Sequence, residues 1–485
     1  MTSISPLTLI ILLPLVASVL VLLLRNSPNL REAASLTVGV SLFACVLSLA
    51  MSGDIHETTW VELLPGLSIS FAVQPLGMLF ALVASALWPV TTLYAIGYMR
   101  EHKEDNQTRF YLFFAVAIAA VMGIAFSDNL FTLFVFYEII TFSTYPLVTH
   151  AGTDKARAGG RTYLSLLLGT SVMFFIPALI GTWYFAGSLD FQAGGVFQHP
   201  VSDTTLSILL VLFVFGIGKA AVMPFHRWLP AAMVAPTPVS ALLHAVAVVK
   251  AGVFSLLKVC AFIFGADTLQ SLPITDYLLY LVGFGILMAS WVAMRQDNLK
   301  KRLAYSTVSQ LGYISLGALL ATSDAFTGSA MHIAMHAAGK ITLFFCAGAI
   351  LVAVHKSEVS QLRGLGRQMP FTMIAFMIGT LSIIGLPPTG GMWSKWFLLL
   401  GTIEAGHWIL LLVLMISSIL NIVYLLPIAI RAFFPGGPLP EGKRQEAPLP
   451  SLIAIGLTSA ACIALFIWPQ VIMDLIPALT SGSKG

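Results

Sequence analysis

Long apolar segments alternate with short polar connections along the whole chain of 485 residues. A helix that crosses a membrane needs about 20 mostly apolar residues, and segments of that length recur from one end of the sequence to the other. The pattern predicts fourteen membrane-spanning helices, over residues 6–24, 33–51, 70–98, 110–126, 129–149, 162–186, 204–231, 237–264, 275–294, 303–321, 325–354, 371–400, 407–432 and 451–473. Several of these ranges are longer than the about 20 residues that one crossing needs, so we expect those helices to tilt or to break.

The positions of the basic residues support this count. Of the 25 Lys and Arg residues, 19 lie on odd-numbered connections, around residues 25–31, 100–109, 155–161, 227, 295–302, 356–367 and 431–444. The even-numbered connections carry none. Because basic loops face the cytoplasm, the pattern predicts that the odd connections are cytoplasmic and that both termini lie outside.

Composition excludes a soluble globule and offers no site for a resident cofactor. The chain is 58% hydrophobic and 9% charged, with a mean hydropathy of +0.91, whereas soluble domains carry about 25% charged residues. The first apolar segment lacks a basic leader and a cleavage site, so we expect it to be retained. The four cysteines are scattered singly, a spacing that does not suit iron–sulfur or zinc binding. We expect no cofactor, no bound metal and no nucleic-acid partner.

One glutamate and five lysines lie well inside predicted spans. A charge at the bilayer centre costs about 3 kcal/mol, so these side chains are expected to face protein, water or one another. Lys258 lies near the outer end of its span and could instead reach the membrane surface. The six residues are Glu138, Lys219, Lys250, Lys258, Lys340 and Lys395.

One span also carries an ionisable stripe. His332, His336 and Lys340 are spaced four residues apart and therefore follow one helical face. Each histidine alone could be a satisfied core residue, and the stripe could in principle hold a metal, but no carboxylate or cysteine shares the face. Lysines repel metal cations, whereas buried lysines and histidines can exchange protons. We therefore expect a hydrated proton relay with Lys340 as its central member and His336 as the neighbour that exchanges with it.

The relay predicted from the sequence extends beyond this stripe. Four lysines and three histidines would carry protons across the middle of the protein, and one glutamate would bias them by pairing with a lysine. The predicted relay residues are Glu138, Lys219, Lys250, Lys340, Lys395, His244, His332 and His336.

Two predicted spans are interrupted by glycine and proline beside a lysine. The segment "FGIGKAAVMPFHRWLP" (215–230) surrounds Lys219, and "GLPPTGGMWSKWF" (385–397) precedes and includes Lys395. Proline removes a helical hydrogen bond and glycine adds backbone freedom. In membrane transporters, paired broken helices mark the transport path. Because each of the two breaks lies beside one lysine, they also suggest that the protein has two related halves.

Several of these segments, taken together, resemble a known family. "NLFTLFVFYEIITFSTYPLV" (129–148), "GIGKAAVMPFHRWLPAAMVAPTPVSALLHAVAVVKAGVF" (216–254), "KRLAYSTVSQLGY" (301–313), "HAAGKITLFFCAG" (336–348) and "GLPPTGGMWSKW" (385–396) are similar to the antiporter-like membrane subunits of respiratory complex I, Mrp-type cation/proton antiporters and membrane-bound hydrogenases. The resemblance implies an all-α polytopic membrane protein of fourteen helices with two inverted five-helix repeats. The corresponding division is 1–109, 110–264 (first repeat), 265–432 (second repeat) and 433–485.

The resemblance also implies roles for single residues. Glu138 matches the fifth-span glutamate, and Lys219 matches the seventh-span lysine with which that glutamate pairs. Lys250 matches a connecting residue of the eighth span, and Lys395 a lysine near the outer exit. His336 and Lys340 match the eleventh-span pair.

The length and the motifs together most resemble the D-like member of the Mrp-type antiporters. This resemblance implies a proton-translocating component of a sodium/proton antiporter in a bacterial or archaeal cytoplasmic membrane, with other membrane subunits, lipid, protons and sodium as partners. Lys395 stands where one type of complex I subunit is expected to carry glutamate. A redox complex that oxidises NADH, hydrogen or formate is the alternative, in which any redox centre would sit on a partner protein. A scaffold, or a coupling element for another species such as inorganic carbon, is a third possibility.

Overall fold

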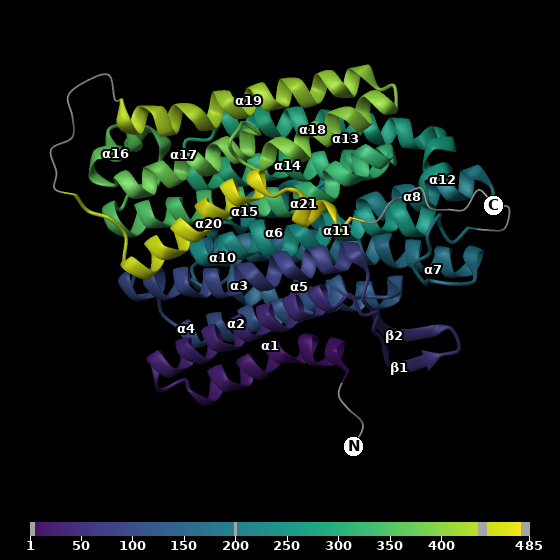
Figure 1. Ribbon diagram of the computed structural model, residues 1–485, viewed down its shortest axis with the longest axis horizontal. Helices are drawn as coiled ribbons and strands as arrows, with labels where there is room; N and C mark the ends of the chain where they lie inside the picture. Colours follow the sequence, from purple (N-terminus) through teal and green to yellow (C-terminus); the bar gives the residue numbers. More distant parts are fainter. Residues whose placement is uncertain (1–4, 198–200, 435–443, 477–485) are drawn as a thin grey trace.

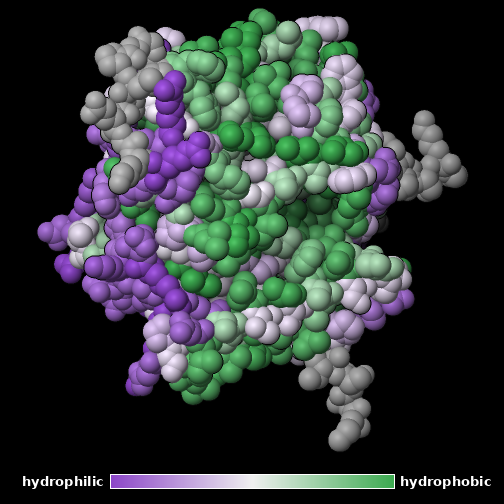
Figure 2. Space-filling view, turned by 60° about the vertical axis from the view of Figure 1, so that its left-hand side comes forward, coloured by the Kyte–Doolittle hydropathy of each residue, from purple (hydrophilic) through white to green (hydrophobic). Residues whose placement is uncertain are grey.

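The computed structural model describes residues 5–197, 201–434 and 444–476. In this part of the chain, long helices with nearly parallel axes lie side by side (Figure 1). Hydrophilic residues gather at one end of the molecule and leave a broad hydrophobic surface beside them (Figure 2). This arrangement is that of a multi-pass membrane protein. Lys443, which contributes to the charge pattern, lies outside the described residues.

Within the described residues, eleven helical segments are long and apolar enough to cross a membrane. Two of them are composite: α6 (Asp154–Thr170) continues into α7 (Ile176–Ala186), and α10 (Thr237–Ala241) into α11 (Val248–Val259), through π-helical turns. The other nine are α1 (Pro6–Leu23), α2 (Pro28–Ser52), α3 (Pro75–Glu101), α4 (Gln107–Ala125), α5 (Leu130–Val148), α13 (Pro273–Arg295), α15 (Ser323–Val354), α19 (Trp408–Phe433) and α20 (Leu449–Ile467).

The two expected breaks are present at the glycine and proline clusters. α8 (Asp203–Gly216) ends just before a short 3-10 turn, Gly218–Ala220, that contains Lys219. α17 (Pro370–Ile384) is separated from α18 (Gly391–Glu404) by the Gly-Leu-Pro-Pro-Thr-Gly segment, residues 385–390. The remaining elements are α9 (Trp228–Ala231), α12 (Ala266–Ser271), α14 (Leu299–Leu320), α16 (Leu365–Gln368), α21 (Gln470–Met473) and the 3-10 turns Phe225–Arg227, Ala232–Val234 and Val359–Leu362.

Each of the fourteen predicted ranges overlaps helix, but one was placed wrongly at its start. Residues 70–72 belong to a β-hairpin of β1 (Glu57–Leu64) and β2 (Leu67–Ala72), so the fold is not purely helical. Residues 67–72 alternate in a way that suits a strand, and Gly66 turns the chain at a φ of +80°. α3 begins only at Pro75, a favourable first helical residue. The number of membrane crossings and the inverted repeats stay predictions.

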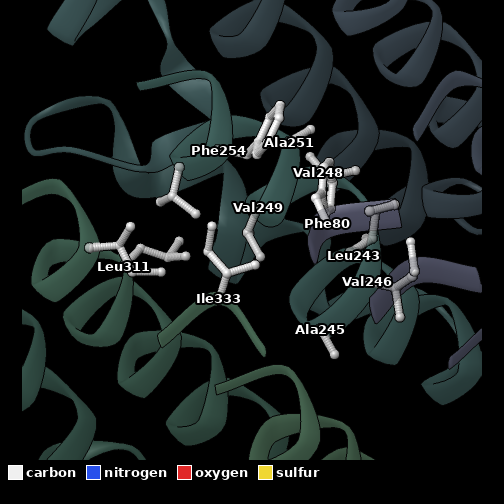
Figure 3. Close-up of a cluster of buried hydrophobic side chains, with 14 of the residues drawn as sticks. Phe80, Leu243, Ala245, Val246, Val248, Val249, Ala251, Phe254, Leu311 and Ile333 are labelled. Atoms are coloured by element: carbon white, nitrogen blue, oxygen red, sulfur yellow. The ribbon is translucent and has the colours of Figure 1, made fainter. Parts of the chain in front are cut away.

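The centre of the molecule is the long helix α15. It is buried along nearly its whole length and packs against α14, α17, α18 and α20. In Figure 3, Phe80 of α3, Val249 of α11, Leu311 of α14 and Ile333 of α15 belong to one buried hydrophobic cluster. This packing fixes α11 against α15, so Lys250, which follows Val249, is brought to His336, one helical turn after His332.

Candidate functional site

The side chains predicted for the relay are buried with one exception. The exposed fraction is 0% for four of them: Lys219, His244, Lys250 and Lys340. It is at most 6% for another three: His332, His336 and Lys395. Glu138 is only half-buried and lies on α5. Because burying a charge is expensive, each of these groups needs a polar partner.

In the first half of the chain, Lys219 is held by α5. Its Nζ donates to Thr141 Oγ1 at 2.6 Å and lies 3.2 Å from the centre of the Tyr137 ring, while its backbone N–H donates to the Tyr137 hydroxyl at 3.0 Å. Tyr137 and Thr141 are four residues apart and share one face of α5. Gly252 permits the close approach of α11, because a Cβ there would collide with the backbone of Lys219.

The expected ion pair between Glu138 and Lys219 is absent from the described structure. Glu138 Oε1 instead accepts a hydrogen bond from Ser171 Oγ at 2.6 Å, and Oε2 is buried without a partner. One residue along a helix turns the side chain by about 100°, so Glu138 points away from the face that holds Lys219. The charge of Glu138 still acts on Lys219 over the longer distance.

Across the boundary between the two predicted repeats, side chains from several helices form a row. Lys250 Nζ lies 2.7 Å from His336 Nδ1, and the rings of His336 and His332 stack with centres 5.6 Å apart. His332 in turn stacks on Tyr313 with centres 5.8 Å apart, and Lys395 Nζ lies 4.9 Å from the centre of the Tyr313 ring. We call these five residues, Lys250, His336, His332, Tyr313 and Lys395, the buried polar row.

Neutral polar groups fix the orientation of the buried polar row. His332 Nδ1 lies 2.8 Å from Ser394 Oγ, and its Nε2 lies 3.1 Å from Gln310 Oε1. Lys395 Nζ donates to the carbonyl oxygen of Ile384 at 2.9 Å and to Ser418 Oγ at 3.3 Å. The break between α17 and α18 therefore supplies a backbone acceptor that a continuous helix would have used internally.

Lys340 lies beside the row, with partners of its own. Its Nζ donates to Ser306 Oγ at 2.7 Å and to the carbonyl oxygen of Leu303 at 3.2 Å, and Tyr424 also donates to Ser306. The lysine in direct contact with His336 is Lys250, and the exchange between His336 and Lys340 through water stays a prediction. The long side chain of Lys340 extends to α14. The four-residue spacing of His332, His336 and Lys340 along α15 could not predict this contact with another helix.

Two further predicted positions differ from expectation. Neither ring nitrogen of His244 has a partner among the described residues, and its ring faces Phe344 with centres 4.7 Å apart. Lys258 does not reach the membrane surface, because it is fully buried, donates to the carbonyl oxygen of Ser127 and lies 4.0 Å from the Phe191 ring centre.

Sequence reasoning missed the neutral members of the site. Tyr313 and Gln310 lie in "KRLAYSTVSQLGY", and Ser394 directly precedes Lys395. Polar residues in an otherwise apolar span were a usable signal, because buried polar groups need partners. Within the described part of the chain, no group of three or more His, Cys, Asp or Glu side chains is placed to hold a metal ion.

The fold and the site thus define a multi-pass membrane protein with a row of ionisable side chains in its interior. Residues 127–421 match the family described as NADH:quinone oxidoreductase/Mrp antiporter, transmembrane. The chain belongs to this family.

Relatives and solved structures come from more than one kind of complex. NADH-quinone oxidoreductase subunit N of Desulforudis audaxviator (strain MP104C) is 35% identical over 93% of this chain and 90% of its own length. The A-type component of the Na(+)/H(+) antiporter of Alkalihalophilus pseudofirmus is 29% identical over 89% of this chain, which spans 56% of that protein. NAD(P)H-quinone oxidoreductase chain 5 of Synechocystis sp. is likewise only about half covered, at 52%.

The fold is shared with two solved membrane complexes. A chain of the archaeal membrane-bound sulfane sulfur reductase superposes with a TM-score of 0.86 at 22% identity, covering 97% of this chain and 96% of that one. A chain of the Mrp complex from Dietzia sp. DQ12-45-1b superposes with a TM-score of 0.83, also at 22% identity, covering 97% of both. At this identity the likeness describes the fold alone.

Proposed function

We propose that this chain is a proton-translocating membrane subunit of a multisubunit complex in a bacterial or archaeal cytoplasmic membrane. The observation that carries the proposal is the buried polar row, in which two lysines are connected through two stacked histidines and a tyrosine. Such groups can gain and lose protons in the membrane interior, where metal cations would be repelled by the lysines.

The steps along the row differ in kind. Lys250 and His336 are at hydrogen-bond distance and can exchange a proton directly. The ring centres that follow are too far apart for direct transfer, so one bridging water per step is required. His336 Nε2 and both ring nitrogens of His244 are buried without a partner in the described part of the chain and are suitable hydrogen-bonding sites for such waters.

In the proposed first repeat, Glu138 and Lys219 are the residues that control proton transfer. The unpartnered Oε2 of Glu138 can accept a proton or a new donor, and either change alters the field at Lys219. Lys340 acts in the same way in the second repeat, because its charge acts on both Lys250 and Lys395. The relay in this proposal keeps all eight predicted residues and adds Tyr313.

For the parent complex, we propose first an Mrp-type sodium/proton antiporter, in which this chain takes the place of the D-like member. The support is the combination of motifs, with relatives that include a component of an Na(+)/H(+) antiporter. A proton pump driven by a redox reaction is the second candidate. It is favoured by the 35% identity to an NADH-quinone oxidoreductase subunit N over nearly the full length of both chains.

One experiment separates these candidates. The complex, purified through a tag on this chain and reconstituted into proteoliposomes, is monitored with an internal pH indicator. A sodium gradient alone drives proton movement if the complex is an antiporter. Proton movement that requires an electron donor and acceptor assigns the redox pump. Absence of proton movement under both conditions would overturn the proposed function.

A further inference from the structure

A cavity of about 440 Å³ lies where the end of α13, the Val359–Leu362 turn and α19 meet. Its polar wall carries three arginines, Arg302, Arg363 and Arg431, and one acid, Asp297. We call it the arginine pocket. Its apolar wall is formed on α19 by Val423, Pro427 and Ile428. All four charged residues belong to connections that the basic-residue pattern places on the cytoplasmic side.

The pocket has an excess of positive charge that the protein does not neutralise. Arg302 is fixed by donating to the backbone carbonyl oxygens of Gln296, Tyr424 and Met294. The guanidinium groups of Arg363 and Arg431 are exposed and make no ion pair or hydrogen bond with the described residues. Hydrogen bonds from Ser360 lower the pKa of Asp297, which keeps this carboxylate charged. Three positive groups against one negative group leave a net charge of +2.

Backbone hydrogen bonds hold the walls of the pocket in place. Val359 N–H donates to the carbonyl oxygen of Asp297 at 2.7 Å, and Gly364 N–H donates to the carbonyl oxygen of Arg431 at 3.0 Å. The first bond ties the segment around Val359 to the chain that follows α13, and the second ties the segment around Gly364 to the end of α19. A pocket built in this way is preorganised, which reduces the entropy lost when an anion binds.

An exposed apolar stripe leads away from the pocket along α19. Val423 lines the pocket and is 53% exposed, and further exposed side chains continue at helical spacing. They are Ile419, Ile416, Met415 and Leu412. The neighbouring helix α13 carries an exposed Trp291, over which the Arg295 guanidinium lies at 5.0 Å. Tryptophan and arginine together are typical of the level of lipid headgroups.

We propose that the arginine pocket binds the phosphate group of an anionic phospholipid, whose acyl chains lie along the exposed stripe of α19. Arg363 and Arg431 supply free donors for the phosphate oxygens, and Arg302 adds a fixed positive charge. Inorganic phosphate shares the anion chemistry but makes no use of the apolar stripe. The lipid would stabilise the junction of three cytoplasmic connections, at a site separate from the buried polar row.

The test uses photoactivatable phosphatidylglycerol, with the reactive group on an acyl chain, added to the complex purified through this chain. Crosslinked peptides are mapped by mass spectrometry. We expect labelling of α19 by phosphatidylglycerol and little labelling by the matched phosphatidylcholine. The double variant R363Q/R431Q should reduce the labelling of α19 about tenfold or more. Because neither side chain makes an ion pair or hydrogen bond with the described residues, we expect the double variant to fold.

The matched control is R157Q/R161Q, which removes the same charge from two exposed arginines at the start of α6. It should leave the labelling of α19 unchanged. Equal labelling by both lipids, or equal labelling of wild type and R363Q/R431Q, would overturn the proposal. So would displacement by inorganic phosphate alone, which would assign a free anion. Labelling of α19 only after the complex is dissociated would assign the stripe to contact with a neighbouring protein and would also overturn it.

Discussion

At the scale of single residues, the proposed relay depends on charges in the membrane interior. Glu138 is the only carboxylate in the middle of a predicted span, and one of its oxygens has no partner among the described residues. Lys340 lies beside the buried polar row, and its charge interacts with the two lysines of the row, Lys250 and Lys395. Both residues can therefore change the protonation of neighbours without touching them.

We predict that Glu138→Gln lowers proton transport by roughly tenfold or more, because the amide keeps the shape and the contact with Ser171 but removes the charge that acts on Lys219. Proton flux into proteoliposomes is the measurement. Glu62→Gln, on the exposed face of β1, is the control with the same chemical change. Wild-type flux in an assembled Glu138→Gln complex would make Glu138 a structural residue.

Lys340→Met should stop transport while the complex still assembles, because methionine fills a similar volume but carries no charge. Ser306→Ala removes a partner of Lys340 and leaves the lysine in place, so it should slow transport less. Both are measured as proton flux over a range of pH values. If Lys340→Met retained full activity at every pH, Lys340 would be a packing residue and not a member of the proposed relay.

At the scale of elements, close approach of backbones positions the site. α11 lies against the 3-10 turn that contains Lys219, and only glycine fits at position 252. An added Cβ would meet the backbone of Lys219, which cannot move aside as a flexible side chain could.

Gly252→Ala is therefore expected to destabilise the protein by about 1–3 kcal/mol and to reduce transport, because the helix must shift away from Lys219. The unfolding midpoint of the purified complex and its proton flux are the readouts. Gly169→Ala, at a helical glycine whose Cβ would meet nothing within 4 Å, is the control and should not destabilise the protein. Equal stability of the two variants would show that α11 has room to move.

The helices and their two breaks could be predicted from the sequence because both follow from local composition. Apolar length marks the spans, and glycine and proline mark the interruptions. The hairpin at 57–72 was missed because its second strand is apolar and merges with the helix that follows. The partners of Glu138, His336 and Lys340 could not be predicted, since they depend on how each helix is rotated against its neighbours. Lys258 was misplaced for the same reason.

At the scale of the whole molecule, the basic connections predict the orientation of the protein in the membrane. Cysteines introduced singly at Ala158 and Ala193, both of which are accessible, should react with an impermeant thiol reagent from opposite sides of the membrane. The predicted cytoplasmic side is that of Ala158. The native cysteines are buried apart from the half-buried Cys45, which is replaced by serine in the background. Labelling of both positions from one side would refute the predicted topology.

The buried polar row is the feature on which the whole account depends, and Lys250 is its member with a direct contact to a histidine. The most direct test is the proton flux of reconstituted complexes that carry Lys250→Met, compared with wild type and with Lys301→Met, an exposed lysine at the start of α14. We predict that Lys250→Met assembles but loses proton flux by about 100-fold, whereas Lys301→Met keeps the wild-type flux. Wild-type flux in an assembled Lys250→Met complex would contradict proton transfer through the row.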